Sequence, residues 1–463
     1  MGFFNEVMSH ASIIGVHLPS YVNMLALQFG QCGNQLGHAL FSKLSTDIDA
    51  KKTGVSYNVN YNYIEEVFDK WFSGLTKDGK RLARAILVDT EEKVINKITD
   101  NKCGSWTYCT SNAFYQAAGG SGNNWAYGYM EKGIRFYESI SDIIQCEIEK
   151  VDHLDGFLFL LSSAGGTGSG IGSRIIELLR EEYKNKSFVS TIVLPFLFGE
   201  MSTQNYNTLL TLVKFLDNAD AVFLFENEDI HHMLKNLLNV DVKLEDINDV
   251  ISKNLSIAFQ PISNMQNNLH SLMAKLVVEP CYKLATIKSV PFLSIFPEYN
   301  ATNTWQSYLY QLKRMLKVYS ITSDIKCKKT KKLSRASCST PSSLYSHSIS
   351  NILITRGSCT YKDIQTDELQ EKCLYADWIT TEAFTHLHQQ RHILNHDKAL
   401  ALLTNNSNIY HPINEVLDKA WNSYIHSAFL HHYKKFGLED DDFLRTFVKI
   451  ENVLKDYKEL DRK

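Results

Sequence analysis

The stretch GFLFLLSSAGGTGSGIGSRIIELLREEY, from Gly156 to Tyr183, decides the fold. It opens with a continuous apolar run, which is typical of a buried parallel strand, and closes with the apolar spacing of an amphipathic helix. Between them lie glycines, one alanine and hydroxyl residues, which leave the main chain open to close approach. The stretch therefore predicts a strand, a turn that a ligand can reach, and a helix.

The same strand-to-helix pattern recurs through the first half of the chain. Apolar strand-like runs precede helix-like runs in MLALQFG with QLGHALFSKL, RAILVDT with EEKVINKI, and STIVLPFLF with YNTLLTLVKFLDNAD, which leads on to AVFLFEN. Helices between parallel strands form βαβ units. The expected fold is an open α/β sheet whose ligand loops gather at the carboxyl ends of its strands.

The glycine turn excludes three familiar motifs. It has no lysine, so it is not a GxxxxGK[ST] phosphate loop. Its glycines alternate from Gly166 to Gly172, which does not fit GxGxxG, and Gly168-Ser169-Gly170 does not fit GxSxG. Two interpretations stay open: a tight structural turn, or a nest in which the amides from Gly165 to Gly168 converge on a phosphate at a helix start, with Thr167 adding a hydroxyl.

Other segments after strands favour the phosphate interpretation. FGQCGNQLG places Gln31 and Gln35 one helical turn apart, and GGSGNNWAYGY is a third turn of small residues. In VDTEE, Asp89 and Glu91 follow a strand and suit a hydrated Mg²⁺ ion. Considered alone, that pair is equally well explained as a helix cap with an acidic first turn.

Composition limits the class of protein. The chain has 463 residues, long enough for two or three domains, and its 44% hydrophobic and 21% charged content is ordinary for a soluble protein. A net charge of −3 argues against nucleic-acid binding, and no apolar run is long enough for a membrane span. The nine cysteines form no CxxC pair, which favours a reducing cytoplasm over a zinc site or a disulfide framework.

The motifs QFGQCGNQLG, RAILVDTE, GSGNNWAYGY and AGGTGSG, in this order and spacing, resemble the tubulin family. The GGTGSG element alone is shared with the bacterial division GTPases, whereas AFLHHYKKFGLEDDDF near the C-terminus is similar to tubulins. KVIN, QNYN and AFQP are similar to the delta class more than to the alpha, beta or gamma classes. The resemblance implies a Rossmann-like parallel-sheet GTPase domain, a second α/β intermediate domain and a C-terminal helical hairpin.

The expected boundaries place an N-terminal extension at 1–23 and a nucleotide-binding domain at 24–228. An intermediate domain follows at 229–405, and a C-terminal helical domain at 406–463. Within the intermediate domain, 326–348 is rich in Lys and Ser and is interpreted as a basic surface insertion. Two helices separated at Gly437 are expected in the last domain, with the acidic run Glu439 to Asp442 opening the second.

By resemblance, the ligand is GTP or GDP with Mg²⁺. Asp89 and Glu91 would hold the metal. The implied nucleotide-binding residues come from the loops after the strands and from two asparagines that would read guanine: Gly30, Gln31, Cys32, Gln35, Gly122, Asn123, Ser162, Ala164, Gly165, Gly166, Thr167, Gly168, Ser169, Gly170, Asn227 and Asn248. No residue is assigned a catalytic role.

Three departures from the family pattern concern affinity and hydrolysis. Leu244 stands where many tubulins stack an aromatic ring on the base, and Gln204 stands where tubulins commonly carry a ribose-side glutamate. In the family, an acidic residue of the next subunit completes the hydrolytic site, but no Asp or Glu lies between Asp249 and Glu279, and Ser271 or its neighbours fill the turn. We therefore expect a tubulin-type GTPase at most, one that activates hydrolysis poorly in its neighbour.

The resemblance also implies partners and a place in the cell. Other tubulin subunits and centriolar or basal-body microtubules are the expected partners, in the cytoplasm and cytoskeleton, with a role in triplet microtubules and cilium assembly. The ending VLKDYKELDRK has no glutamate-rich tail, so we expect little recruitment of motors. The alternatives are an epsilon-like isotype, a non-polymerising GTP-binding adaptor, and a dinucleotide-dependent enzyme.

Overall fold

The structure is a computed structural model. It describes residues 23–50, 55–100, 104–116, 119–196, 201–238, 241–262, 269–292, 304–317, 345–359, 364–379 and 383–461. The expected N-terminal extension up to residue 22 and most of the expected basic insertion lie outside the described residues.

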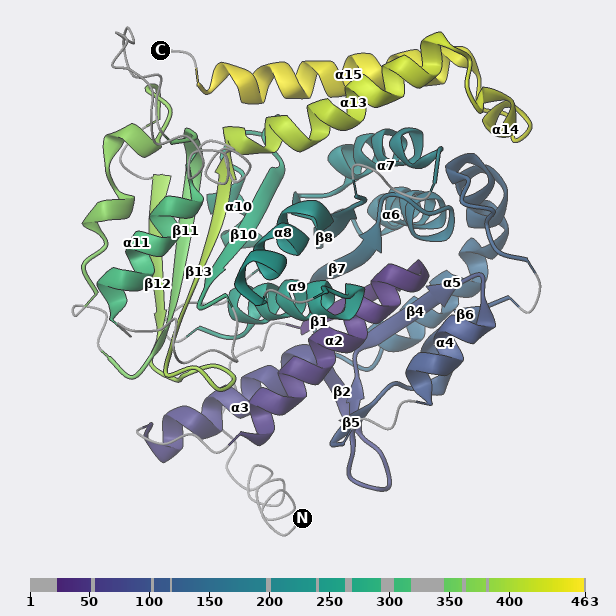
Figure 1. The fold of residues 1–463 in the computed structure, drawn as a ribbon. Helices are drawn as coiled ribbons and strands as arrows, with labels where there is room; N and C mark the ends of the chain where they lie inside the picture. Colours follow the sequence, from purple (N-terminus) through teal and green to yellow (C-terminus); the bar gives the residue numbers. More distant parts are fainter. Residues whose placement is uncertain are drawn as a thin grey trace, which may run out of the picture.

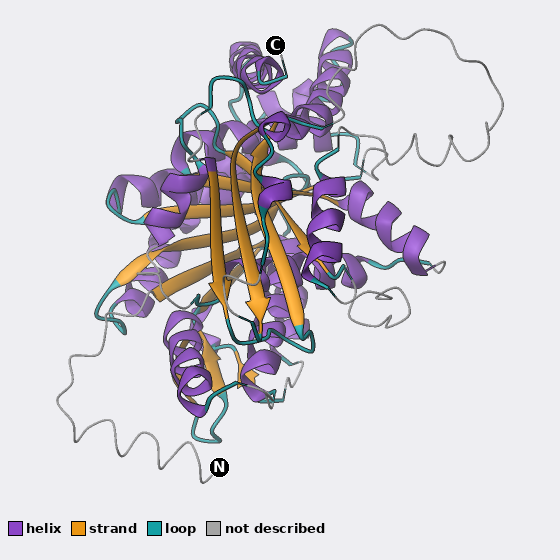
Figure 2. Cartoon of the chain, turned by 90° about the vertical axis from the view of Figure 1, so that its left-hand side faces the viewer, coloured by secondary structure: helices purple, strands orange, loops and turns teal. Residues whose placement is uncertain are grey.

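A ten-stranded sheet forms the centre of the molecule, in the order β12-β11-β13-β10-β9-β8-β7-β1-β4-β6 (Figures 1 and 2). From β6 to β10 every neighbouring pair is parallel, whereas β13 runs antiparallel to both β10 and β11. The strands are β1 Asn23–Phe29, β4 Ala85–Asp89, β6 Ala113–Tyr115, β7 Leu154–Ser162, β8 Ser187–Leu194, β9 Ala221–Glu226, β10 Leu284–Val290, β11 Ser348–Gly357, β12 Phe384–Gln389 and β13 Lys398–Asn406.

The alternation of side chains along β1 shows how the sheet is buried on both faces. Leu25 and Leu27 join one hydrophobic core and Met24 and Ala26 join another, because successive strand residues point to opposite faces. The first core packs against α5 Gly133–Ile148, α6 Gly172–Glu182, α7 Gln204–Asn218, α13 Tyr410–Ile425, α14 Leu430–Lys434 and α15 Asp440–Glu459. The second packs against α2 Gly30–Asp49, α3 Tyr57–Trp71, α4 Glu92–Thr99, α8 Asn227–Leu238, α9 Leu244–Phe259 and α10 Leu269–Leu276.

Smaller elements complete the described fold. A third core forms where α11 Trp305–Met315 covers β10, β11 and β13. A second sheet holds β2 Phe72–Leu75, β3 Arg81–Ala83 and β5 Trp106–Thr107. The short turns are η1 Thr110–Asn112, η2 Tyr127–Lys132, η3 Thr167–Ile171, η6 Asp367–Leu369, η7 Lys372–Leu374 and η9 Ser407–Ile409, of which η2 and η3 are π-helical.

The predicted fold class is confirmed: a parallel α/β region continues into a second α/β region, and helices close the chain. The expected domain boundaries stay predictions, and strand pairing runs without interruption from β9 to β10 across the boundary at 228. Of the expected insertion, Ser346 and Ser348 are buried, and Ser348 begins β11, so these last residues belong to the core rather than to a surface segment.

The C-terminal hairpin differs from the prediction in one respect. The chain breaks before Gly437 as well, between α13 and the short α14, where Ser427 and Phe429 adopt φ values of 52° and 60°. No glycine marks this turn, so the sequence carries no ordinary signal for it. The second long helix, α15, begins after Glu439 with a capping box to Asp442, as the acidic run indicates. α13 and α15 lie side by side across one end of the molecule (Figure 1).

Candidate nucleotide-binding site

Three adjacent parallel strands end at the candidate site. β1 pairs with β4 on one side and with β7 on the other, so their carboxyl ends lie together. Gly30 follows β1, Asp89 ends β4 and Ser162 ends β7, and each leads toward a helix or a helical turn. The arrangement is the one at which open α/β sheets bind ligands.

The glycines of these loops touch the backbone of their neighbours. A Cβ on Gly30, whose φ is +69°, would lie 3.0 Å from the amide nitrogen of Gly168, and one on Gly166 would lie 2.7 Å from the amide nitrogen of Asn124. Gly165 differs, because a Cβ there would meet nothing within 4 Å. The packing explains why the loop after β1 needs glycine at Gly30 and the loop after β7 needs glycine at Gly166, and it leaves Gly165 facing open space.

Thr167 joins three of the loops. Its hydroxyl lies 2.7 Å from the Thr90 hydroxyl, directly after β4, and 3.0 Å from the Ser121 hydroxyl in the GGSGNNWAYGY segment. The structure therefore brings Thr167 and its neighbours Ala164 to Gly170 against the loop of Gly122 and Asn123, whose φ values are +56° and +50°. The sequence indicated Thr167 as a phosphate donor but gave no sign of this linking role.

Asn207 on α7 is a second junction, and the sequence analysis missed it. Its side-chain amide donates to the carbonyl of Ala164 at 2.7 Å and to the carbonyl of Asn123 at 2.9 Å, and its oxygen accepts from the amide of Trp125 at 3.1 Å. It thus fixes the glycine loop relative to the third loop. Its place in QNYN is the only sequence signal that singles it out.

Asp89 and Glu91, the residues predicted to hold a metal, lie at the end of β4 and just before α4. Asp89 is 3% exposed, and its Oδ1 accepts from the amides of Thr90 at 2.7 Å and Glu91 at 3.3 Å. Both amides precede α4, whose N-cap residue Glu91 makes no side-chain capping hydrogen bond, so Asp89 does not act as the helix cap that the sequence also allowed. Its Oδ2 is buried with no hydrogen-bond partner, and burial raises the pKa of the carboxyl to about 6. Glu91 is exposed and lies against Gly120.

These residues fit Mg²⁺, which takes one or two carboxylates and completes its shell with water and phosphate oxygens. A free, buried Asp89 oxygen beside an exposed Glu91 is such a donor set. Among the described residues, no group of three or more His, Cys, Asp or Glu side chains could hold a metal ion, so a purely protein-made metal centre is not seen there.

The first loop contributes the start of α2. Gln31 is exposed and Gln35 is half-buried, one turn apart on the same helix as predicted. Cys32, between them, is a neutral thiol because burial raises its pKa to about 12. A neutral thiol places no negative charge next to the predicted phosphate position.

The two predicted guanine readers come from neighbouring helices. Asn227 begins α8 directly after β9, and Asn248 lies in the second turn of α9. Leu244, the first residue of α9, is 55% exposed, so an apolar side chain rather than an aromatic ring faces solvent at this position. Gln204 is buried and its amide donates to the carbonyl of Phe196 at 2.8 Å, so its side chain is already engaged by the protein.

Lys132 is a cation that the sequence analysis did not connect with the site. It lies at the end of η2, is 4% exposed, and its ammonium donates to the carbonyls of Gly119 and, at 3.0 Å, Gly120. Burial lowers its pKa. The glycine loop contains no lysine, but Lys132 binds the carbonyls of the neighbouring loop at Gly119 and Gly120.

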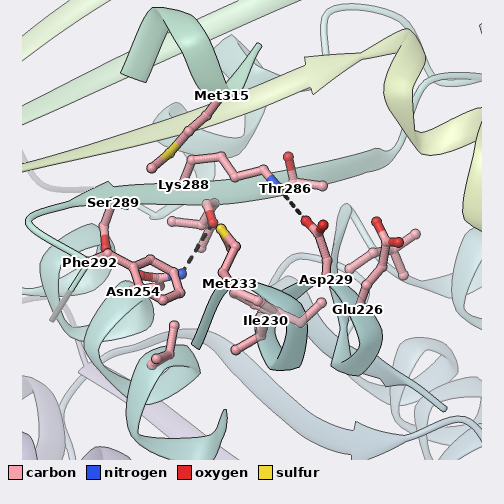
Figure 3. Close-up of a pocket in the computed structure, with 14 residues that line it drawn as sticks. Glu226, Asp229, Ile230, Met233, Asn254, Thr286, Lys288, Ser289, Phe292 and Met315 are labelled. Atoms are coloured by element: carbon pink, nitrogen blue, oxygen red, sulfur yellow. Dashed lines mark hydrogen bonds and ion pairs between the residues drawn. The ribbon is translucent and has the colours of Figure 1, made fainter. Parts of the chain in front are cut away.

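A small cavity at the carboxyl end of β9, lined by Glu226 and Asp229 among others, is too small for a nucleotide. Its volume is about 30 Å³, whereas pockets for small-molecule ligands measure roughly 300–1,000 Å³. Figure 3 shows Lys288 reaching Asp229 across it, at 3.5 Å, with Glu226 beside them. The cavity therefore holds an ionisable cluster, in which Glu226 and Asp229 flank Asn227 in the sequence, rather than a second ligand site.

The arrangement as a whole suits a polyphosphate with a cation and a base. The glycine loop and Thr167 lie at the start of η3 and α6, and the carboxylates of Asp89 and Glu91 lie beside them. Of the two asparagines, Asn227 begins α8 and Asn248 lies in the second turn of α9. None of the helices in the described part of the chain is both long and apolar enough to cross a bilayer.

Comparison with known proteins gives a consistent result. A sequence model described as Tubulin/FtsZ family, GTPase domain, matches residues 23–235. The chain is 34% identical to the tubulin delta chain of Canis lupus familiaris and equally to that of Homo sapiens, over 456 residues that cover 94% of this chain and 99% of each relative. It is 31% identical to the tubulin gamma chain of Candida glabrata over 276 residues, 58% of each chain.

Proposed function

The chain belongs to the tubulin family, as a delta-tubulin-like member with a GTPase domain that binds GTP or GDP, and from this premise we propose the finer roles below. We propose that it is a component of centrioles or basal bodies, where it supports triplet microtubules and the assembly of cilia or flagella. Its partners would be other tubulin subunits. The similarity to delta chains along nearly the whole length supports this proposal.

We propose that the nucleotide lies on the loops after β1, β4 and β7. The observation that carries this is the junction at Thr167, whose hydroxyl lies within 3.0 Å of both Thr90 and Ser121 and so joins three loops at one sheet edge. Amides of Ala164 to Gly170 would hold the phosphates, and those of Gly122 and Asn123 would lie around the γ-phosphate. Asp89 and Glu91 would hold a magnesium ion, and Asn227 and Asn248 the guanine. The metal would supply charge neutralisation at the phosphates when bound.

Heat release tests this assignment. The purified chain is denatured, and the freed ligand is identified by chromatography; we expect GTP or GDP near one mole per mole of protein. Recovery of NAD or another dinucleotide would support the enzyme alternative and contradict the assignment. The cellular proposal is tested separately: a tagged copy should concentrate at basal bodies, and a uniform cytoplasmic distribution in ciliated cells would contradict it.

We propose that the chain is a poor activator of hydrolysis in a neighbouring subunit. The described helix α10, with the sequence LHSLMAKL, has no carboxylate, and a serine or alanine does not orient water as a carboxylate does. Nucleotide would then act mainly as a structural ligand that stabilises the folded subunit. GTP turnover in co-assembled subunits should be slow, and turnover equal to that of bulk tubulin would contradict the proposal.

A further inference from the structure

The short helix α14, in the C-terminal hairpin, contacts the α7 residue that holds the loops of the candidate site. Tyr433 is fully buried, and its hydroxyl donates to Oδ1 of Asn207 at 2.6 Å, across 226 residues of sequence. Its ring also packs on Tyr206 and Phe443, with centroids 5.7 and 5.4 Å apart. Burial raises the pKa of the Tyr433 hydroxyl, so the group stays a hydrogen-bond donor.

The network around Asn207 has only one consistent orientation. Its amide nitrogen must face the carbonyls of Ala164 and Asn123, because carbonyls only accept. Its oxygen must face the amide of Trp125 and the hydroxyl of Tyr433, because both donate. All four hydrogen-bonding positions of the Asn207 side chain are therefore used, and removal of the Tyr433 hydroxyl leaves one lone pair of the buried Oδ1 unpaired.

Two further contacts attach the α14 region to the segment that begins with Gly122 and Asn123. The side-chain amide of Asn124 donates to the carbonyl of His432 at 2.8 Å. The ring of Tyr127 stacks on Phe436, directly after α14, with centroids 4.6 Å apart. The loop of Gly122 and Asn123 is thus held between the glycine loop and the C-terminal hairpin.

From these contacts we infer that Tyr433 is a positioning residue for the nucleotide loops, acting through Asn207 on the carbonyls of Asn123 and Ala164. It touches no nucleotide itself. Asn123 is the residue proposed at the γ-phosphate, which GDP lacks. Loss of the Tyr433 hydroxyl therefore weakens the binding of GTP more than the binding of GDP. By thermodynamic reciprocity, binding of GTP also holds α14 more firmly than binding of GDP. This inference rests on the proposed nucleotide assignment.

The test compares two single hydroxyl deletions in the same core. Tyr433→Phe removes the bond to Asn207, and Tyr206→Phe is the matched control, because Tyr206 is also buried and its hydroxyl donates elsewhere, to the carbonyl of Ala428 at 3.2 Å. Dissociation constants for GTP and GDP are measured on the full-length chain at a fixed Mg²⁺ concentration. We expect Tyr433→Phe to raise the dissociation constant for GTP about two- to tenfold and that for GDP by less. Tyr206→Phe should leave the ratio of the two dissociation constants unchanged.

The outcomes separate the inference from a purely structural role. An unchanged GTP-to-GDP ratio in Tyr433→Phe overturns the inference, whether or not the variant is less stable. An equal change of the ratio in both variants also overturns it. If the unmodified chain binds neither nucleotide, the proposed function fails and this inference fails with it. As a second measurement, amide exchange in 430–434 should be slower with GTP than with GDP, and this difference should vanish in Tyr433→Phe.

Discussion

Single glycines in the loops after β1 and β7 have different structural roles, although they look equivalent in the sequence. Gly30 and Gly166 are packed against backbone atoms of neighbouring loops, whereas Gly165 faces open space. The first two are required by the fold itself. Gly165 is required only if a ligand occupies the space beside it, which makes it a direct probe of the proposed phosphate position.

Gly165→Ala should therefore separate folding from binding. We expect its free energy of unfolding without nucleotide to stay within about 0.5 kcal/mol of the unmodified chain, while affinity for GTP falls at least tenfold because a methyl group enters the phosphate space. Gly30→Ala is the contrasting variant, since a positive φ and a 3.0 Å contact should cost more than about 1 kcal/mol of stability. Denaturant unfolding and nucleotide titration measure both. Unchanged GTP affinity in Gly165→Ala would contradict the assignment.

Asp89 is a residue whose charge is unfavourable for the empty protein. Burial raises the pKa of its carboxyl to about 6, so at pH 7 the charged form is held against a desolvation cost. Asp89→Asn keeps an oxygen for the amides of Thr90 and Glu91 and removes the charge. We expect the apo protein to be as stable or slightly more stable, while the gain in GTP affinity on adding Mg²⁺ shrinks about tenfold. A full Mg²⁺ response in this variant would argue against a metal role for Asp89.

At the scale of elements, the order of strands and helices followed the apolar patterns. Continuous apolar runs became the buried parallel strands β1, β7, β8 and β9, because both faces of this sheet are covered by helices. The pairing of β13 between β10 and β11 could not be read from periodicity, since register depends on partners distant in the chain. The turn before α14 was not predicted for a related reason, because it is stabilised by packing and contains no glycine.

The end of strand β9 should give the protein a pH-dependent stability. Burial is the main cause that raises the pKa of Glu226 to about 7, with Asp229 and Glu415 adding to the rise and Lys288 opposing it. The folded state thus holds its proton more tightly than the unfolded chain. The resulting stabilisation is fully present below the ordinary glutamate pKa of about 4.3 and is lost as the pH rises through 7.

Unfolding free energies measured from pH 5 to pH 8 test this expectation. Relative to Glu226→Gln, the unmodified chain should lose stability as the pH rises, because glutamine does not titrate and the other ionisable groups are common to both chains. Glu228→Gln, on the next helix, is the control, since that half-exposed residue pairs with His232 at the surface. Equal slopes for Glu226→Gln and the unmodified chain would contradict the prediction.

At the scale of the whole molecule, a buried ion pair joins segments from opposite ends of the chain. Arg391 and Asp47 have fully buried side chains 2.7 Å apart, and Arg391 also donates to the carbonyl of Asp47 at 2.8 Å and to the side-chain oxygen of Asn60 at 2.7 Å. Through these bonds the loop after β12 is attached to α2, the helix that begins at the candidate site, and to α3. Removing one partner leaves a buried charge without compensation.

Arg391→Leu should lower the free energy of unfolding by about 3–5 kcal/mol. Adding Asp47→Asn to that variant should recover part of the loss, because the orphaned charge disappears while an oxygen remains for the amide of Leu394, 2.5 Å away. Denaturant unfolding of the single and double variants measures the difference. A double variant no more stable than Arg391→Leu would show that the charge is not the cause.

The sequence by itself determined the α/β alternation, the close backbone approach at the glycine loop and the resemblance to tubulins, because these depend on local periodicity and on short motifs. It also indicated Thr167 and Asp89. The tertiary structure alone decided which distant side chains hold that site: Asn207 and Tyr433 are 226 residues apart, and although each lies in a family-like motif, neither motif indicates that the two side chains meet. Hydrogen-bond partners between separate elements are chosen by how those elements pack, and packing is a property of the folded chain rather than of any short stretch of it.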